Sequence, residues 1–234
     1  MKFYVVKTRE KGKGIMNKKR VVKIILGVVI VLVLMFLIYA IRNFCIINSM
    51  INKSSEYQSK TNYYMKVSRD DSNLEYIEEY NKGNQRKIIV KKKEDGSIMT
   101  QYMKDSASKV FCDMNDGRKF MYETTEPIFP NIRIEFNNDT TYNVIKDSIF
   151  AKIKTEKIDD KDYYAINDLK NLRGFSDENV KNIYYFNKET GLIELVKTIN
   201  KDNSKAITTY EYKFEGVEDK DFELPNVLEY TINK

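Results

Sequence analysis

Side chains able to support chemistry are few and scattered in this sequence. Asp113–Gly117 (DMNDG) resembles the start of a calcium loop, but the later ligands of such a loop, including a glutamate at its twelfth position, are missing. Asp159, Asp160 and Asp162 form a second acidic cluster, for which a solvated turn is the simpler interpretation. The chain has no histidine, the commonest general base and a frequent zinc ligand. We therefore expect no enzyme, no cofactor and no metal site.

The two cysteines, Cys45 and Cys112, are too few for a disulfide-stapled extracellular scaffold. They lie 67 positions apart, one directly after an apolar segment and the other deep in the chain. Two free thiols are the favoured interpretation, and a bridge between them is the alternative.

Charge is divided unevenly along the chain. Residues 1–45 carry ten Lys and Arg side chains against one acidic side chain, a formal charge of +9, whereas residues 46–234 carry 30 against 33, a charge of −3. The basic triplet Lys91–Lys93 is followed at once by Glu94 and Asp95, which is typical of a strand end and turn. Because nucleic-acid binding needs basic residues clustered on the folded domain, we expect no nucleic-acid partner.

Eighteen uncharged residues, Ile24–Ile41, follow the basic segment. As a helix they would extend roughly 27 Å, close to the hydrocarbon thickness of a bilayer. We therefore predict a transmembrane helix over residues 21–42. The alternative is a cleaved signal peptide, but its apolar region is usually about 7–15 residues long. Ile38 is also too large for the position three residues before a cut after Ala40.

The flanking charges predict the orientation of this helix. Lys and Arg are retained on the cytoplasmic side, so residues 1–20 are predicted to be a cytoplasmic basic tail of a single-pass protein of the cell membrane. Within this tail, residues 1–15 are either an extension from start-site choice or part of the tail itself. We predict a helical connector over residues 43–60 and one extracytoplasmic antiparallel β domain over residues 61–234.

The pattern of the outer domain indicates an antiparallel sheet. Tyr, Ile, Val, Phe and Thr recur in short runs separated by turn residues, among them Asp95-Gly96, Asn115–Gly117 and Asn187–Gly191. The fold class that we predict is a single transmembrane helix plus a β-rich α+β domain, with a twisted half-barrel-like sheet of about ten strands and one or two short helices. The predicted strands cover residues 62–70, 73–81, 86–93, 97–104, 109–114, 118–123, 131–136, 151–158, 162–169 and 204–217. A hairpin over 183–199 supplies two more strands on either side of its Asn187–Gly191 turn, and the predicted helix covers 140–153.

Two segments of this domain resemble the LolA/LppX/RseB superfamily, the lipoprotein-carrier-like fold, in its membrane-anchored Gram-positive type. The first is a hairpin with Tyr184, Tyr185, Asn187, Thr190, Gly191 and Leu192, and the second is a closing segment with Asp219, Asp221, Phe222, Glu223, Leu224 and Pro225. The resemblance covers about residues 60–234 and implies an open, cupped sheet over an apolar cavity. An anchored domain departs from the family's soluble carriers, because it cannot ferry a lipoprotein between membranes.

The resemblance implies that the cavity is lined by adaptable apolar and aromatic side chains, for each of which ordinary core packing is the alternative. The candidate lining residues are Met65, Met99, Met103, Tyr185, Tyr210 and Tyr212. The function that we expect is a membrane-anchored extracytoplasmic binding or sensing module of the bacterial envelope. Its expected partners are the membrane and a lipid, lipoprotein or hydrophobic peptide. The alternative is a scaffold without a ligand that docks another membrane or cell-wall protein.

Overall fold

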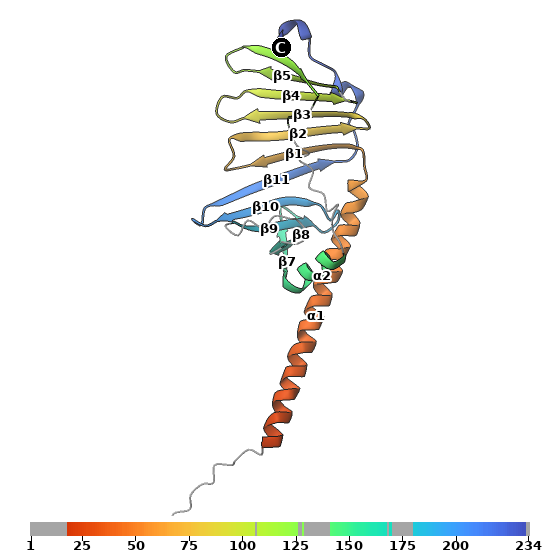
Figure 1. The fold of residues 1–234 in the computed structure, drawn as a ribbon, viewed down its shortest axis with the longest axis vertical. Helices are drawn as coiled ribbons and strands as arrows, with labels where there is room; N and C mark the ends of the chain where they lie inside the picture. Colours follow the sequence, from red (N-terminus) through yellow and green to blue (C-terminus); the bar gives the residue numbers. More distant parts are fainter. Residues whose placement is uncertain are drawn as a thin grey trace, which may run out of the picture.

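Helix α1 runs without a break through both the predicted span and the predicted connector. The computed structural model describes residues 18–105, 107–125, 128, 141–167, 169 and 180–232, and α1 spans Lys18–Gln58 (Figure 1). No proline interrupts this stretch, and a helix of 41 residues is about 60 Å long. The helical part of the chain therefore reaches Gln58, two residues short of the end predicted for the connector.

The two halves of α1 differ in what surrounds their side chains. From Val22 to Ile41 the apolar side chains are exposed, and this half is long and apolar enough to cross a membrane. After Ile41 the helix buries Asn43, Ile47, Met50 and Ser54, whose spacing of three and four residues places them on one side. The second half of α1 thus belongs to the core of the domain.

The described strands form one twelve-stranded sheet in the order β12-β6-β5-β4-β3-β2-β1-β11-β10-β9-β8-β7. Neighbouring strands are antiparallel except β12, which runs parallel to β6. The sheet twists along its length, so that β7 and β8 turn away from the direction of β1–β5 (Figure 1). The strands are β1 (Asn62–Arg69), β2 (Leu74–Lys82), β3 (Gln85–Lys92), β4 (Ile98–Lys104), β5 (Ala107–Asp113), β6 (Lys119–Thr124), β7 (Lys152–Ile158), β8 (Lys161–Asn167), β9 (Val180–Asn187), β10 (Ile193–Asn200), β11 (Lys205–Lys213) and β12 (Thr231–Ile232).

This architecture confirms the predicted fold class, with differences in detail. The described residues contain twelve strands: eleven correspond to predicted ranges, and β12, with two residues, has no predicted run of its own. Helix α2 spans Thr141–Phe150, and its predicted extension to residue 153 is wrong because β7 begins at Lys152. The strand predicted over residues 131–136 lies outside the described residues.

One face of the sheet, which we call the helix face, carries α1 and α2. Ile47 and Met50 of α1 and Val144 of α2 form a core with side chains of β7–β10 on this face. The members from the strands are Ile153, Ile166, Tyr184, Phe186, Ile193 and Val196. The main core therefore lies under the second half of α1, toward the β7 end of the sheet.

The opposite face, which we call the strap face, is crossed by the chain that follows β11. This segment contains two short 3-10 helices, η1 (Asp219–Phe222) and η2 (Val227–Glu229). Lys82 pairs with Asp219 at 2.8 Å, and the Lys87 ammonium donates to the Asp221 carbonyl at 2.8 Å. The segment thereby covers the strap face of β2 and β3 before it reaches β12.

The β9–β10 hairpin fixes the position of α1 through Gly191. This residue has a φ of +70°, which glycine adopts without strain. A Cβ at this position would lie 2.4 Å from the Met50 carbonyl oxygen and 3.0 Å from the Ser54 nitrogen. The helix backbone can therefore approach the turn only because residue 191 has no side chain.

Candidate functional site

The helix face of β2–β6 lies beyond the end of α1, where Tyr57 packs against Phe214 with ring centroids 4.8 Å apart. The register of these strands arranges their helix-face side chains in three rows that run across the strands. The first row is Ile77, Val90, Met99, Cys112 and Phe120; the second is Glu79, Ile88, Gln101, Val110 and Tyr122; the third is Asn81, Arg86, Met103, Ser108 and Thr124. The face therefore changes from apolar in the first row to mostly polar in the third.

An apolar cavity of about 270 Å³ opens along the first row. Val90, Met99, Cys112 and Phe120 contribute cross-strand neighbours to its wall. The other lining residues come from strand ends and turns and are Leu74, Lys92, Ser97, Ile98 and Met114. Burial raises the pKa of the Cys112 thiol, so this group stays neutral and behaves as a small apolar side chain.

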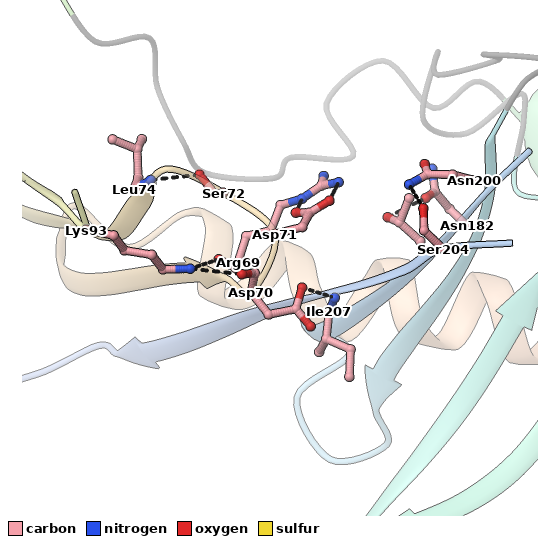
Figure 2. Close-up of polar contacts among 11 residues, drawn as sticks. Arg69, Asp70, Asp71, Ser72, Leu74, Lys93, Asn182, Asn200, Ser204 and Ile207 are labelled. Atoms are coloured by element: carbon pink, nitrogen blue, oxygen red, sulfur yellow. Dashed lines mark hydrogen bonds and ion pairs between the residues drawn. The ribbon is translucent and has the colours of Figure 1, made fainter. Parts of the chain in front are cut away.

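The turn beside this cavity is held by polar contacts that Figure 2 shows. Arg69 forms an ion pair with Asp71, and hydrogen bonding to Arg69 lowers the pKa of the Asp71 carboxyl group. The Lys93 ammonium donates to the Arg69 and Asp70 carbonyls at 3.1 and 2.9 Å, and the Leu74 amide donates to Ser72 Oγ at 3.0 Å. These contacts fix the backbone that presents Leu74 to the cavity.

A buried ion pair lies between the second and third rows. Glu79 is fully buried, and Arg86 donates to its two carboxylate oxygens at 3.0 and 3.1 Å. The Tyr63 hydroxyl of β1 donates to Glu79 Oε1 at 2.6 Å. Charge-assisted bonds of this kind hold the three side chains in one geometry, so this part of the face is rigid.

Gln101 makes a second buried polar contact in the middle row. Its Nε2 donates to Ser108 Oγ at 2.8 Å, and its Oε1 accepts a bond from the Ile128 amide at 3.2 Å. The Ile128 backbone therefore lies over the centre of this face. The middle row is covered, and the apolar cavity ends there.

A separate hollow of about 580 Å³ lies at the opposite ends of β5 and β6. Its described lining is polar, with Ser108 and Thr124 from the third row and the ion pair between Lys109 and Glu123 at 3.4 Å. Among the described residues, its lining is more polar than that of the cavity in the first row.

The structure places one of the six predicted lining residues, Met99, in the wall of the apolar cavity. Met65 is fully buried on the helix face of β1, next to Tyr212 of β11. Tyr210 and Tyr212 stack on that face with centroids 6.4 Å apart. Met103 lies in the polar third row, and Tyr185 lies on the strap face against Tyr163 at 6.4 Å. The helix face thus carries five of the six, but the cavity brings only one of them to its wall.

Sequence reasoning missed most of the cavity wall. Met99 has Val90 and Cys112 as its direct cross-strand neighbours, and Phe120 lies in the same row. The signal that could have found them is the set of turns, because Asp95-Gly96 fixes the register of β3 with β4 and Asn115–Gly117 fixes that of β5 with β6. The buried Glu79 was detectable in the same way, as a charged residue in register with Met65 and Ile88.

Within the described ranges no group of three or more His, Cys, Asp or Glu side chains is placed to hold a metal ion. Cys45 and Cys112 are both free thiols, Cys45 exposed on α1 and Cys112 buried in β5. The described wall of the site therefore offers a mostly apolar surface.

The site lies on an open, twisted, mostly antiparallel sheet that carries a long helix on one face. No family model matches the chain, and no curated protein matches it. Among solved structures, an uncharacterized conserved protein from Thermus thermophilus is similar at 6% identity and a TM-score of 0.47, over 80% of this chain and 98% of that one.

Solved structures similar to this chain also include a LolA superfamily protein from Nitrosomonas europaea, at 14% identity and a TM-score of 0.28, over 76% of this chain and 97% of that one. The MucA/MucB complex of Pseudomonas aeruginosa is similar at 8% identity and a TM-score of 0.35, over 76% of this chain and 61% of that one. A LolA superfamily protein and a MucA/MucB complex are thus among the solved structures to which this chain is similar. Likenesses at these values assign this chain no ligand and no partner.

Proposed function

We propose that this chain is a membrane-anchored, extracytoplasmic binding module that holds an apolar group of a lipid, lipoprotein or peptide in the cavity of the first row. The observation that carries the proposal is the cavity itself, about 270 Å³ with a mostly apolar wall, beside a middle row in which Glu79, Ile88, Gln101 and Val110 are buried. Its volume is just below the range of about 300–1,000 Å³ typical of ligand pockets. It suits the end of an acyl chain or one or two apolar side chains.

The anchoring part of the proposal rests on α1. Its first half exposes a continuous apolar surface over Ile24–Ile41, which is costly in water and favourable in a bilayer. The nine Lys and Arg side chains before this run favour a cytoplasmic amino terminus. The sheet then lies on the extracytoplasmic side.

The position of the cavity indicates the source of its ligand. β4, in the centre of the cavity wall, is seven strands away from β8 in the sheet, a separation of up to roughly 34 Å at about 4.8 Å per strand. β8 belongs to the end of the sheet next to the apolar half of α1 (Figure 1). A lipid in the surrounding bilayer would have to leave it to reach the cavity. The proposal therefore favours a ligand presented from outside the bilayer, such as an acylated or hydrophobic segment of another envelope protein.

The test uses the absence of tryptophan from the chain. Phe120→Trp places a single tryptophan in the cavity wall, and Tyr185→Trp places one on the strap face as the matched control. We expect a fatty acid with a brominated chain to quench the fluorescence of the first variant in the full-length, detergent-solubilised protein, with saturation, and to leave the second unchanged. Equal quenching of both variants, or of neither, would rule out binding in the cavity.

A second candidate function is docking of another envelope protein at the β12 edge. Here the exposed apolar side chains gather in one segment, with Leu228 94% exposed and Ile232 63% exposed. Such a patch on an edge strand favours association with another chain. Docking at this edge can be tested by replacing Leu228 with a photo-crosslinking residue. Crosslinks to one protein in intact cells would favour docking, and the absence of crosslinks would rule out this second function.

A further inference from the structure

Helix α2 exposes more of its large apolar side chains than a surface helix of a water-soluble domain usually does. Its side toward the protein buries Val144, Asp147 and Ser148. Its outer side exposes Tyr142 and Phe150 by 69% and 66%, and Ile145 is 47% exposed. Surface helices in water normally turn the apolar side inward, so α2 is arranged for apolar surroundings on its outer side.

The contacts of α2 place it where the apolar run of α1 ends. The Tyr39 hydroxyl donates to the Ala151 carbonyl at 2.6 Å. The Asn43 amide, one helical turn further along α1, donates to the carbonyls of Ser148 and Ala151 at 3.1 and 2.9 Å. The carboxyl end of α2 is thereby fixed beside Ile41, the last residue of the run, and Figure 1 shows α1 continuing without a neighbouring element on the other side of this point.

The composition of this region is that of a membrane interface. Tyrosine and other aromatic residues are enriched at the level of lipid headgroups, and Lys and Arg there interact with lipid phosphates. Tyr39, Tyr142 and Phe150 are aromatic, and Lys146 lies over the Tyr142 ring at 5.8 Å. Arg42, which is exposed, adds a second positive charge directly after the apolar run.

We propose that α2 is an interfacial helix whose outer side, formed by Tyr142, Ile145 and Phe150, inserts into the headgroup region of the bilayer that α1 spans. The inference rests on the membrane anchoring proposed above and adds a second contact with the lipid surface. Because α1 and α2 are joined by hydrogen bonds, two attachments fix the orientation of the domain. The β7 end of the sheet then faces the membrane, and the cavity faces away from it.

The experiment places single tryptophans in the full-length protein, reconstituted in phosphatidylcholine and phosphatidylglycerol vesicles with bromine near the headgroup or deep in the acyl chain. Phe150→Trp reports on α2, Val29→Trp on a position inside the apolar run, and Leu228→Trp on an exposed apolar position at the β12 end. We expect lipid with shallow bromine to remove most of the emission of Phe150→Trp. Deep bromine should remove most of that of Val29→Trp, and neither lipid should change Leu228→Trp.

The three variants separate the two proposals. If Val29→Trp is quenched while Phe150→Trp behaves like Leu228→Trp, anchoring stands and the interfacial role of α2 is overturned. If Val29→Trp is not quenched by either lipid, anchoring fails and the interfacial role fails with it. Quenching of Phe150→Trp more strongly by deep than by shallow bromine also contradicts the proposal, because an interfacial helix does not reach the centre of the bilayer.

Discussion

The buried ion pair on the helix face provides the sharpest test of the packing described above. The Glu79 side chain is 1% exposed and the Arg86 side chain 18% exposed. Replacing Arg86 by methionine leaves the carboxylate buried with the Tyr63 hydroxyl as its remaining partner from this group. Removing one member of a buried pair costs about 3–5 kcal/mol, and the exposed part of Arg86 puts this case near the lower value, about 3 kcal/mol.

The reverse substitution should cost less because the two side chains differ in their access to water. In Glu79→Leu the remaining guanidinium is close enough to the surface to regain hydration, so we expect a loss of about 1–2 kcal/mol. In the double variant Glu79→Leu/Arg86→Met no charge is left buried. Its stability should lie within about 2 kcal/mol of the unsubstituted protein, because well-packed apolar replacements of buried pairs are often neutral and the main remaining cost is the carboxylate acceptor that the Tyr63 hydroxyl loses.

The assay is pulse proteolysis of the full-length protein in detergent at increasing urea concentrations, which gives the free energy of unfolding of each variant. Tyr63→Phe serves as an intermediate case and should lose about 1.5–3 kcal/mol, since it removes one hydrogen bond to a charged group. Two results would refute the reasoning: a loss below about 1 kcal/mol for Arg86→Met, or a double variant whose loss equals the sum of the two single losses.

Three further predictions concern the packing of the helices and the titration of tyrosines. Gly191→Ala should lower the free energy of unfolding in urea by more than about 2 kcal/mol. Gly117 has a similar φ but no atom within 4 Å of the position that a Cβ would take, so Gly117→Ala should lower it only by the backbone strain of about 1 kcal/mol. Equal losses would contradict the close approach of Gly191 to α1. Asn43→Leu should cost about 1–3 kcal/mol and increase protease cleavage near α2, because the Ser148 carbonyl loses this donor and the Ala151 carbonyl loses one of its two side-chain donors; unchanged cleavage would count against this role. Burial and nearby carboxylates raise the pKa values of Tyr64 and Tyr163 in the folded protein. The stability that these two side chains contribute is therefore complete below their unfolded pKa of about 10 and is lost as the pH rises through their raised folded pKa values. Ultraviolet titration of the folded protein should show tyrosines that ionise late, and the same tyrosines should ionise normally in urea.

The local parts of this fold were predictable because they are encoded in neighbouring residues. The turns at Asp95-Gly96 and Asn115–Gly117 defined β3–β6 to within a few residues, since type and length of a turn set the register of a hairpin. The sequence after the apolar run contains no proline up to Gln58, so the continuation of α1 beyond Ile41 was also predictable. The alternation of Tyr210 and Tyr212 correctly indicated one shared face of β11.

The non-local parts were not predictable in the same way. Nothing in the sequence of β1 shows that it pairs with β11, because that contact joins residues far apart in the chain. Without this pairing, the face to which Tyr185 belongs cannot be related to that of Met65, and so a lining set drawn from residue types combined both faces. The contact of Gly191 with α1 is of the same kind, since its φ follows from the turn but its neighbour does not.

The continuity of α1 constrains how the proposed module would meet its ligand. A domain on a flexible linker samples many heights above a membrane, but here the helix that would cross the bilayer also supplies Ile47 and Met50 to the core. About 22 Å of helix, from Asn43 to Gln58, is packed against the sheet, so rotation or tilt of the anchor moves the sheet with it. The cavity is then held at one height and in one orientation, and only a ligand presented there can enter. If the chain binds its ligand as proposed, a flexible insertion between Arg42 and Asn43 should weaken ligand capture in the membrane. The same insertion should leave the cavity of the purified protein able to bind.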